Sequence, residues 1–171
     1  MVDVDSIDWK NPGHKQRRYN LNISSDAKFF KKSTDRLHKT LETELTCLQY
    51  AKELNLKKIQ QLVVGEIDRD GMSYIITKYC GRNITRSRVP PDWKEQLNQI
   101  DIELKLLIDN YKVYHNDVQA RNCFIDNHQQ LTVIDFDLAT IGSPNRRASK
   151  RHGFLNCDFI RSKIQERWGI K

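Results

Sequence analysis

Two short segments in the second half of the sequence combine side chains that could carry out phosphate chemistry. Residues 115–122 read HNDVQARN, and residues 133–137 read VIDFD. Within them, Asp117, Asn122 and Asp135 offer carboxylate and amide oxygens, which are the ligands that Mg²⁺ prefers. Phosphoryl transfer from ATP needs one carboxylate to orient the attacking hydroxyl, and an amide oxygen and a second carboxylate to hold Mg²⁺ against the phosphates. The three side chains therefore form a candidate site for this chemistry.

The elements around these segments are expected to bring them together. A helix from Asp92 to about Lys112, with apolar residues at spacings of three and four, leads into the first segment. Short strands over Cys123–Ile125 and Leu131–Ile134 predict a β-hairpin between the two segments. Because a hairpin reverses the chain, Asp135 should return to the side of Asp117.

The first half of the chain reads as strands around one helix, followed by a connector. The expected elements are a strand pair over Leu21–Lys32, a helix over Ser33–Leu54, strands over Ile59–Glu66 and Met72–Tyr79, a connector over Arg82–Pro91, and a final helix over Asp158–Trp168. Strands come first and helices dominate later, which is typical of an α+β chain.

The two segments resemble the catalytic loop HxDxxxxN and the metal-binding DFG motif of the protein-kinase-like superfamily. The resemblance covers roughly residues 27–140 and is most specific in its second half. It implies one minimal domain over residues 1–171 with a two-lobed protein-kinase-like fold, made of a small β-rich N-lobe and a truncated, mainly helical C-lobe. The implied parts are an N-lobe over about residues 1–80, a hinge over 81–91, a C-lobe core over 92–142 and a basic tail over 143–171.

The same resemblance implies roles for individual residues. Asp117 corresponds to the catalytic aspartate, and Asn122 and Asp135 correspond to the magnesium ligands. His115 and Phe136 would belong to an apolar spine beneath them. ATP and Mg²⁺ are the implied cofactors.

Kinases also hold the phosphates with a strand lysine that pairs with a helix glutamate. Lys28, on the apolar segment just before the expected helix, fits this role, with Lys31 as the alternative. On the helix, Glu44 is the expected partner, because Leu48 follows it by one turn as the family pattern requires. Glu42 points about 200° away on the helix and is the weaker choice.

Residues 74–81 resemble a kinase hinge. Thr77 would be the gatekeeper, and backbone atoms of Lys78 and Cys80 would bind adenine. The implied nucleotide-binding residues are Lys28, Lys78, Cys80, Asn122 and Asp135.

Several positions depart from the family pattern. Residues 1–27 hold a single glycine, Gly13, so a glycine-rich phosphate loop is missing. Asp137 replaces the glycine of the DFG motif, as in some kinases that act on saccharides. Asn116 replaces the arginine that reads a phosphorylated activation loop, and Gln119 replaces a lysine near the γ-phosphate, a charge for which Arg121 could partly substitute.

The end of the chain sets a further expectation. Since 34 residues follow Asp137, the peptide-docking helices of a full protein kinase should be absent or minimal. In this compactness the chain resembles lipopolysaccharide-sugar kinases, RIO kinases and the kinase-like ATPase of the KEOPS complex.

These features together favour an ATP- and Mg²⁺-dependent phosphotransferase. The acceptor is expected to be a hydroxyl, first a Ser or Thr of a protein and second a saccharide or other small molecule. Two other hypotheses stay open: a nucleotide-binding pseudokinase that acts as an interaction module, and an RNA-associated ATPase.

The positive charge of the chain is concentrated in its last residues. The chain of 171 residues carries a formal charge of +7, and residues 138–171 hold 8 basic and 2 acidic side chains. This basic tail could bind nucleic acid or another acidic partner, although such tails are more often only solvated.

The acidic amino end lacks the basic and apolar parts of a signal peptide, and no segment is long and apolar enough for a membrane span. Four cysteines without a CxxC pair favour reduced thiols, so we expect a cytoplasmic protein.

Overall fold

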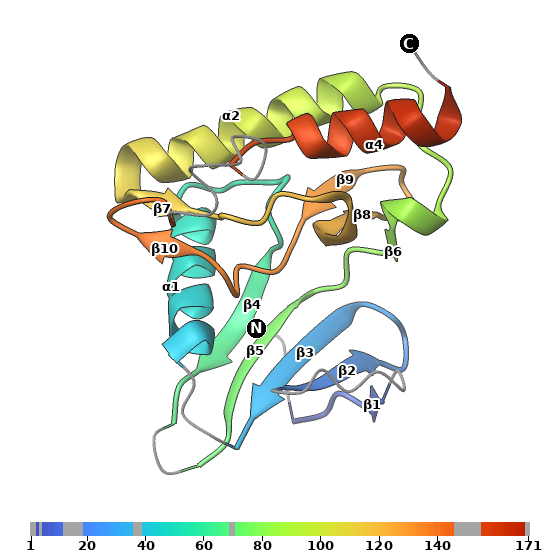
Figure 1. Cartoon of the computed structure of the whole chain (residues 1–171). Coiled ribbons are helices and arrows are strands. Elements are labelled where there is room, and N and C mark those ends of the chain that lie inside the picture. The colour runs from blue at the N-terminus through green and yellow to red at the C-terminus, as the bar shows by residue number, and fades with distance from the viewer. Residues whose placement is uncertain are drawn as a thin grey trace.

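The computed structural model describes most of the chain, with a sheet-rich part first and helices later (Figure 1). The described residues are 3, 5–11, 19–35, 39–68, 71–145 and 155–169. Gly13 and the basic run over residues 146–151 lie outside them. Within the described ranges, no helix combines the length and the apolar character needed to cross a membrane.

The sheet-rich part is built on five antiparallel strands in the order β1-β2-β3-β5-β4. The strands are β1 (Trp9–Lys10), β2 (Asn20–Ser24), β3 (Phe29–Thr34), β4 (Leu62–Glu66) and β5 (Ser73–Lys78). The predicted strand pair over residues 21–32 is thereby confirmed as β2 and β3. In the centre of the sheet, Lys32 on β3 lies between Leu21 on β2 and Ile75 on β5.

Helix α1 (Lys39–Glu53) packs beside β4 and β5 and buries one apolar side. It begins later than residue 33 because β3 continues to Thr34, which pairs with Ser73 on β5. A glycine permits the close contact of helix and sheet. A Cβ atom on Gly65 would lie 2.5 Å from Cδ1 of Leu45, so a larger residue there would force the Leu45 side chain to shift.

The later part consists of α2 and short strands that frame the loop of residues 115–122. Its elements are β6 (Arg82–Asn83), η1 (Ile84–Arg86), α2 (Trp93–Tyr111), β7 (Val113–Tyr114), η2 (Ala120–Asn122), β8 (Cys123–Ile125), β9 (Leu131–Val133), β10 (Thr140–Ile141) and α4 (Asp158–Trp168). The predicted helices over residues 92–112 and 158–168 are confirmed, and so is the hairpin, as β8 and β9. The pairing of β10 with β7 was not predicted, because both are only two residues long.

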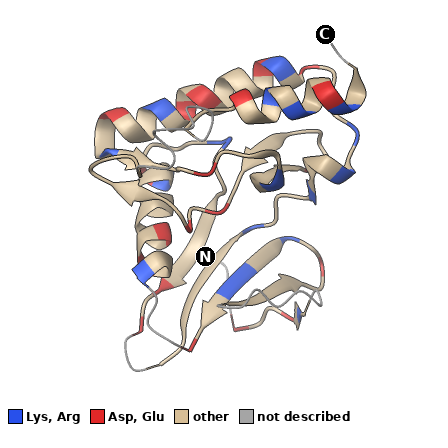
Figure 2. Ribbon diagram, viewed as in Figure 1, with Lys and Arg blue, Asp and Glu red and all other residues tan. Residues whose placement is uncertain are grey.

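Helix α4 packs against α2 through polar contacts. Arg161 forms an ion pair with Asp101 at 2.6 Å, and the same carboxylate accepts a hydrogen bond from the backbone of Cys157. Both helices carry positive as well as negative side chains (Figure 2). Nucleic-acid binding by the tail stays a prediction. All four cysteines are free thiols, and three of them are buried.

Gly81, between β5 and β6, occupies a position that excludes other residues. Its φ is +88°, and a Cβ atom there would lie 2.0 Å from the carbonyl oxygen of Ile125. Gly81→Ala should therefore lower the free energy of unfolding by about 2 kcal/mol more than Gly142→Ala does. Gly142 also has a positive φ, +103°, but a Cβ atom there would meet nothing within 4 Å. Urea denaturation of both variants measures the difference, and equal losses would show that the close approach to Ile125 does not matter.

Candidate active site

A cavity of about 280 Å³ lies between the sheet and the segments that carry the two sequence motifs. Its walls come from β2, β3, α1, the end of β5, η2, β8 and the residues after β9. The lining residues are Leu21, Ile23, Phe30, Lys32, Glu44, Gln60, Lys78, Tyr79, Cys80, Arg121, Asn122, Phe124, Ile134 and Asp135. The cavity thus brings together residues that are more than a hundred positions apart in the sequence.

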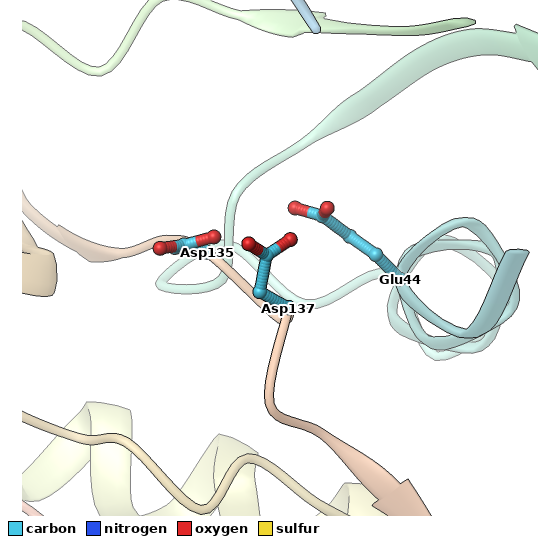
Figure 3. A group of neighbouring side chains, drawn as sticks. All are labelled: Glu44, Asp135 and Asp137. Carbon is cyan, nitrogen blue, oxygen red and sulfur yellow. The ribbon is translucent and has the colours of Figure 1, made fainter. Parts of the chain in front are cut away.

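A buried lysine, Lys32, joins the sheet, the helix and the segment after β9. Its ammonium donates to Glu44 at 2.8 Å, to Asp135 at 3.2 Å and to Asp137 at 2.5 Å. The side chain of Lys32 is 7% exposed and that of Glu44 is 4% exposed. Glu44 comes from α1, whereas Asp135 and Asp137 come from the loop after β9, and their carboxylates converge (Figure 3). Lys32 is therefore the cation that links the three elements.

The prediction that Lys28 pairs with Glu44 is wrong, and so is the alternative of Lys31. Lys28 is exposed and forms an ion pair with Asp26 at 3.0 Å, before β3 begins. Lys31 lies on the other side of the strand, over the ring of Tyr74 at 5.3 Å. Successive side chains of a strand point to opposite faces, so Lys28 and Lys32 share a face and Lys31 does not. Glu44, by contrast, does pair with a lysine of the strand, as the sequence predicted.

Burial and mutual attraction act against each other in this cluster. Burial alone would lower the pKa of the Lys32 ammonium, but Glu44, Asp135 and Asp137 together raise it above its usual range. Burial raises the pKa of Glu44 to about 7, opposed by Lys32 and reinforced by Asp137 and Asp135. Lys32 is therefore held in its charged form, and Glu44 depends on Lys32 for its own charge.

The loop of residues 115–122 holds the carboxylate of Asp117 in a fixed position. Arg121 donates to its two oxygens at 3.1 and 2.8 Å, and Asn122 Nδ2 donates to Oδ2 at 2.7 Å. Gln119 Nε2 also donates to Oδ1. Asp117 and Asn122 are both buried. These contacts hold the carboxylate in one orientation.

The donor set near the cavity fits a magnesium ion. Because Asn122 directs Nδ2 at Asp117, its amide oxygen Oδ1 is the atom that it can offer to a cation. Asp135 lines the same cavity, and its side chain is 27% exposed. An amide oxygen and a partly exposed carboxylate are hard ligands of the kind that Mg²⁺ takes. Asn122 and Asp135, which the sequence predicted as metal ligands, thus lie at one cavity.

His115 lies beneath this site as a neutral, hydrogen-bonded side chain. Its Nε2–H donates to the carbonyl of Ile134 at 3.0 Å, and its Nδ1 accepts from the backbone N–H of Asp117 at 3.3 Å. The ring packs on Phe136 with 4.4 Å between the ring centroids. Burial lowers the pKa of His115 below its usual range, partly offset by the hydrogen bond to Ile134.

This pattern predicts a pH-dependent contribution of His115 to stability. Below about pH 6.5 the unfolded chain binds a proton at His115 that the folded chain excludes. The free energy of unfolding should therefore fall as the pH decreases from 7 to 5, and less so in His115→Phe. Urea denaturation across this range measures the slope. His128→Gln, which changes an exposed histidine, is the control, and equal slopes for His115→Phe and the unmodified chain would contradict the prediction.

The predicted hinge residues Thr77, Lys78 and Cys80 lie along one side of the cavity. Lys78 and Cys80 line it directly, and Thr77 is buried behind it. A residue that the sequence reading missed, Gln60, donates to Thr77 Oγ1 at 2.8 Å and accepts from the backbone of Asp135 at 3.5 Å. Gln60 therefore ties the hinge side of the cavity to the segment of the second motif.

Asn116 ties the first motif to the chain beyond the second. Its Nδ2 donates to the carbonyl of Leu138 and to Thr140 Oγ1, each at 2.9 Å, and its Oδ1 accepts from the backbone of Asn145 at 3.2 Å. Asn116 therefore holds the segment 138–145 in place through uncharged hydrogen bonds.

Comparison with known proteins gives one partial similarity. No family model matches the chain. Over 120 residues, the chain is 28% identical to "Probable cyclin-dependent kinase 9" of Schizosaccharomyces pombe, a match that covers 64% of this chain. The match covers 20% of that protein, so the chain spans about a fifth of its relative's length. This similarity supports a distant relationship to protein kinases.

Proposed function

We propose that the chain is a phosphotransferase that uses ATP with Mg²⁺ and passes the γ-phosphate to a hydroxyl acceptor. The proposal includes a two-lobed, kinase-like organisation in which residues 81–91 form the hinge and the cavity holds the nucleotide. The similarity to a cyclin-dependent kinase points the same way.

The observation that carries the proposal is the buried cluster around Lys32. Its ammonium binds Glu44 from α1 and Asp135 from the second motif, 103 residues away in the sequence. A buried charge is costly unless it is paired, and here the partners come from two elements that are distant in sequence. A cation held at the wall of a cavity beside metal-ligating oxygens is what phosphate binding requires.

Each group then has a role in the reaction. Asp117 accepts the proton of the attacking hydroxyl and orients its oxygen. Lys32, kept in place by Glu44, binds phosphate oxygens, and Lys78 and Cys80 contact the base through their backbones. Asn122 and Asp135 hold Mg²⁺, which when bound neutralises negative charge on the phosphates. Arg121 and Gln119 keep the carboxylate of Asp117 directed at the acceptor.

The acceptor that we favour is a Ser or Thr hydroxyl of a protein, including this chain itself. A saccharide or small-molecule hydroxyl is the alternative, favoured by Asp137 in the position where saccharide kinases also carry aspartate. Either acceptor can approach Asp117 in the same way, because the catalytic groups contact only the reacting hydroxyl.

The direct test is phosphate transfer by the purified chain. Protein is incubated with γ-³²P-labelled ATP and Mg²⁺, with casein and with a panel of sugars as acceptors. Labelled protein or sugar is expected from the unmodified chain and from Asp126→Asn, and no label from Asp135→Asn. The control Asp126 lies in the turn between β8 and β9, where its side chain accepts from the backbone N–H groups of His128 and Gln130. Label that persists in Asp135→Asn would contradict the assigned metal ligand, and no label at all would contradict the transferase.

One observation favours a second candidate, a nucleotide-binding module without catalysis. Both oxygens of Asp117 are occupied by donors from Arg121, Gln119 and Asn122, which leaves few directions for an acceptor hydroxyl. In that case Mg²⁺ and ATP together would raise the melting temperature of the chain without any transfer of label.

A further inference from the structure

The cluster around Lys32 contains one more carboxylate than the proposed function uses. An ammonium group has three N–H donors, and here Glu44, Asp135 and Asp137 each lie within hydrogen-bond distance of it. Every donor of Lys32 is thus engaged within the protein. A phosphate can bind Lys32 only if one of the three carboxylates moves away.

The exposed fractions of the three acidic side chains indicate which carboxylate can move away from Lys32. The side chain of Glu44 is 4% exposed, and it would lose its counter-ion inside the protein. Asp135 and Asp137 are 27% and 26% exposed, so both can exchange Lys32 for water or a cation. Asp135 has a further partner in the proposed metal ion. Asp137 has no other role in the proposed function, so its departure from Lys32 is the step that frees a donor.

The charges at this end of the cavity add a second constraint. Three carboxylates surround one ammonium, whereas the nearby charge of Asp117 is matched by Arg121 at 2.8 Å. The three carboxylates that contact Lys32, of which Glu44 and Asp135 also line the cavity, thus outnumber its single positive charge. A metal-free nucleotide, which carries about four negative charges near neutral pH, meets repulsion from Asp137 as well as competition for Lys32.

Building on the proposed function, we propose that Asp137 is a specificity-determining residue that makes nucleotide binding depend on a divalent cation. Asp137 holds the donor of Lys32 that a phosphate oxygen needs, and its charge opposes a nucleotide that arrives without metal. A metal-bound nucleotide brings positive charge, which offsets this repulsion and allows a phosphate oxygen to replace Asp137 at Lys32. Asp137 selects the metal complex of the nucleotide over the free nucleotide.

Binding measurements test this inference without relying on catalysis. Calorimetric titration with an ATP analogue that has a non-hydrolysable β–γ bond gives the dissociation constant in Mg²⁺ and in EDTA. For the unmodified chain we expect much tighter binding in Mg²⁺ than in EDTA. Asp137→Asn, which keeps the shape but removes the charge, should reduce the ratio of the two constants by about tenfold or more, through tighter binding in EDTA.

Two further variants make the test specific. Asp109→Asn removes the same charge from an exposed position on α2, and its ratio should equal that of the unmodified chain. Asp137→Gly restores the residue found in the DFG motif and should reduce the ratio as Asp137→Asn does, which covers the case in which one variant folds poorly. An unchanged ratio in both Asp137 variants would overturn the inference alone. Weaker binding only in Mg²⁺ would also overturn it, since Asp137 would then be a metal ligand. If the unmodified chain bound the analogue under neither condition, the proposed function would fall as well.

Discussion

Replacing Lys32 with methionine is expected to abolish measurable phosphate transfer and to destabilise the fold. Methionine fills a similar volume but leaves Glu44 buried without its cation. Breaking a buried ion pair from one side costs about 3–5 kcal/mol at a pH where the remaining group is charged. Loss of a preorganised donor to a developing charge lowers the rate by about 10²–10³-fold, beyond any loss of nucleotide affinity. Urea denaturation and label transfer measure the two effects separately.

The pH dependence of this variant gives a second signature. Burial already raises the pKa of Glu44 to about 7, and without Lys32 it should rise further. An acid whose pKa is higher in the folded chain stabilises the fold at low pH and loses that contribution as the pH rises. Lys32→Met should therefore be closer in stability to the unmodified chain at pH 5 than at pH 8. Equal losses at both pH values would contradict the assigned coupling.

Matched controls separate structure from function. Lys28→Met and Lys31→Met remove the lysines that flank the site on the same strand segment, and both should keep stability and transfer near normal. The double variant Lys32→Met/Glu44→Leu replaces the buried pair by apolar groups, which is often neutral for stability. We expect it to fold better than Lys32→Met and to remain inactive. Activity in the double variant would rule out Lys32 as a phosphate-binding group.

The elements of this chain were predictable where a single local pattern determines them. Helix α2 and helix α4 follow from apolar spacing, and the hairpin of β8 and β9 follows from short apolar runs around a turn. Because that hairpin is local, the position of Asn122 and Asp135 at one cavity could also be inferred. The start of α1 could not, since the helical pattern overlaps the end of β3 and only pairing with β5 determines where the strand stops.

The candidate site was less predictable where it depends on contacts distant in sequence. Because side chains alternate along a strand, Lys31 lies on the opposite face and cannot pair with Glu44. The same alternation cannot decide between Lys28 and Lys32, which share a face. That choice depends on which strand residue lies opposite Glu44 of α1, and this follows from the packing of helix and sheet. Gln60 carried no motif at all, because its role arises from two partners, Thr77 and Asp135, on different elements.

Asp117→Asn is expected to stop transfer while leaving nucleotide binding intact. The carboxylate accepts a proton in the proposed reaction, and loss of such a group lowers the rate by about 10²–10⁴-fold. The side chain of asparagine keeps one oxygen that accepts from Arg121, but its NH₂ group replaces the second oxygen. Only a modest loss of stability should follow. Label transfer and calorimetric titration with the non-hydrolysable ATP analogue give the two readouts.

The combination of the two readouts distinguishes catalysis from binding. Asp117 does not line the cavity, whereas Asn122 and Asp135 do. Asp117→Asn should therefore lower the rate at saturating nucleotide, whereas Asp135→Asn should weaken binding of the Mg²⁺ complex. Arg121→Gln, which frees Asp117 from its ion pair, should reduce the rate less than Asp117→Asn, because the carboxylate keeps its contacts with Gln119 and Asn122. If transfer continued at the normal rate in Asp117→Asn, its carboxylate would be a structural group that holds the loop, and the proton would have to leave by another route.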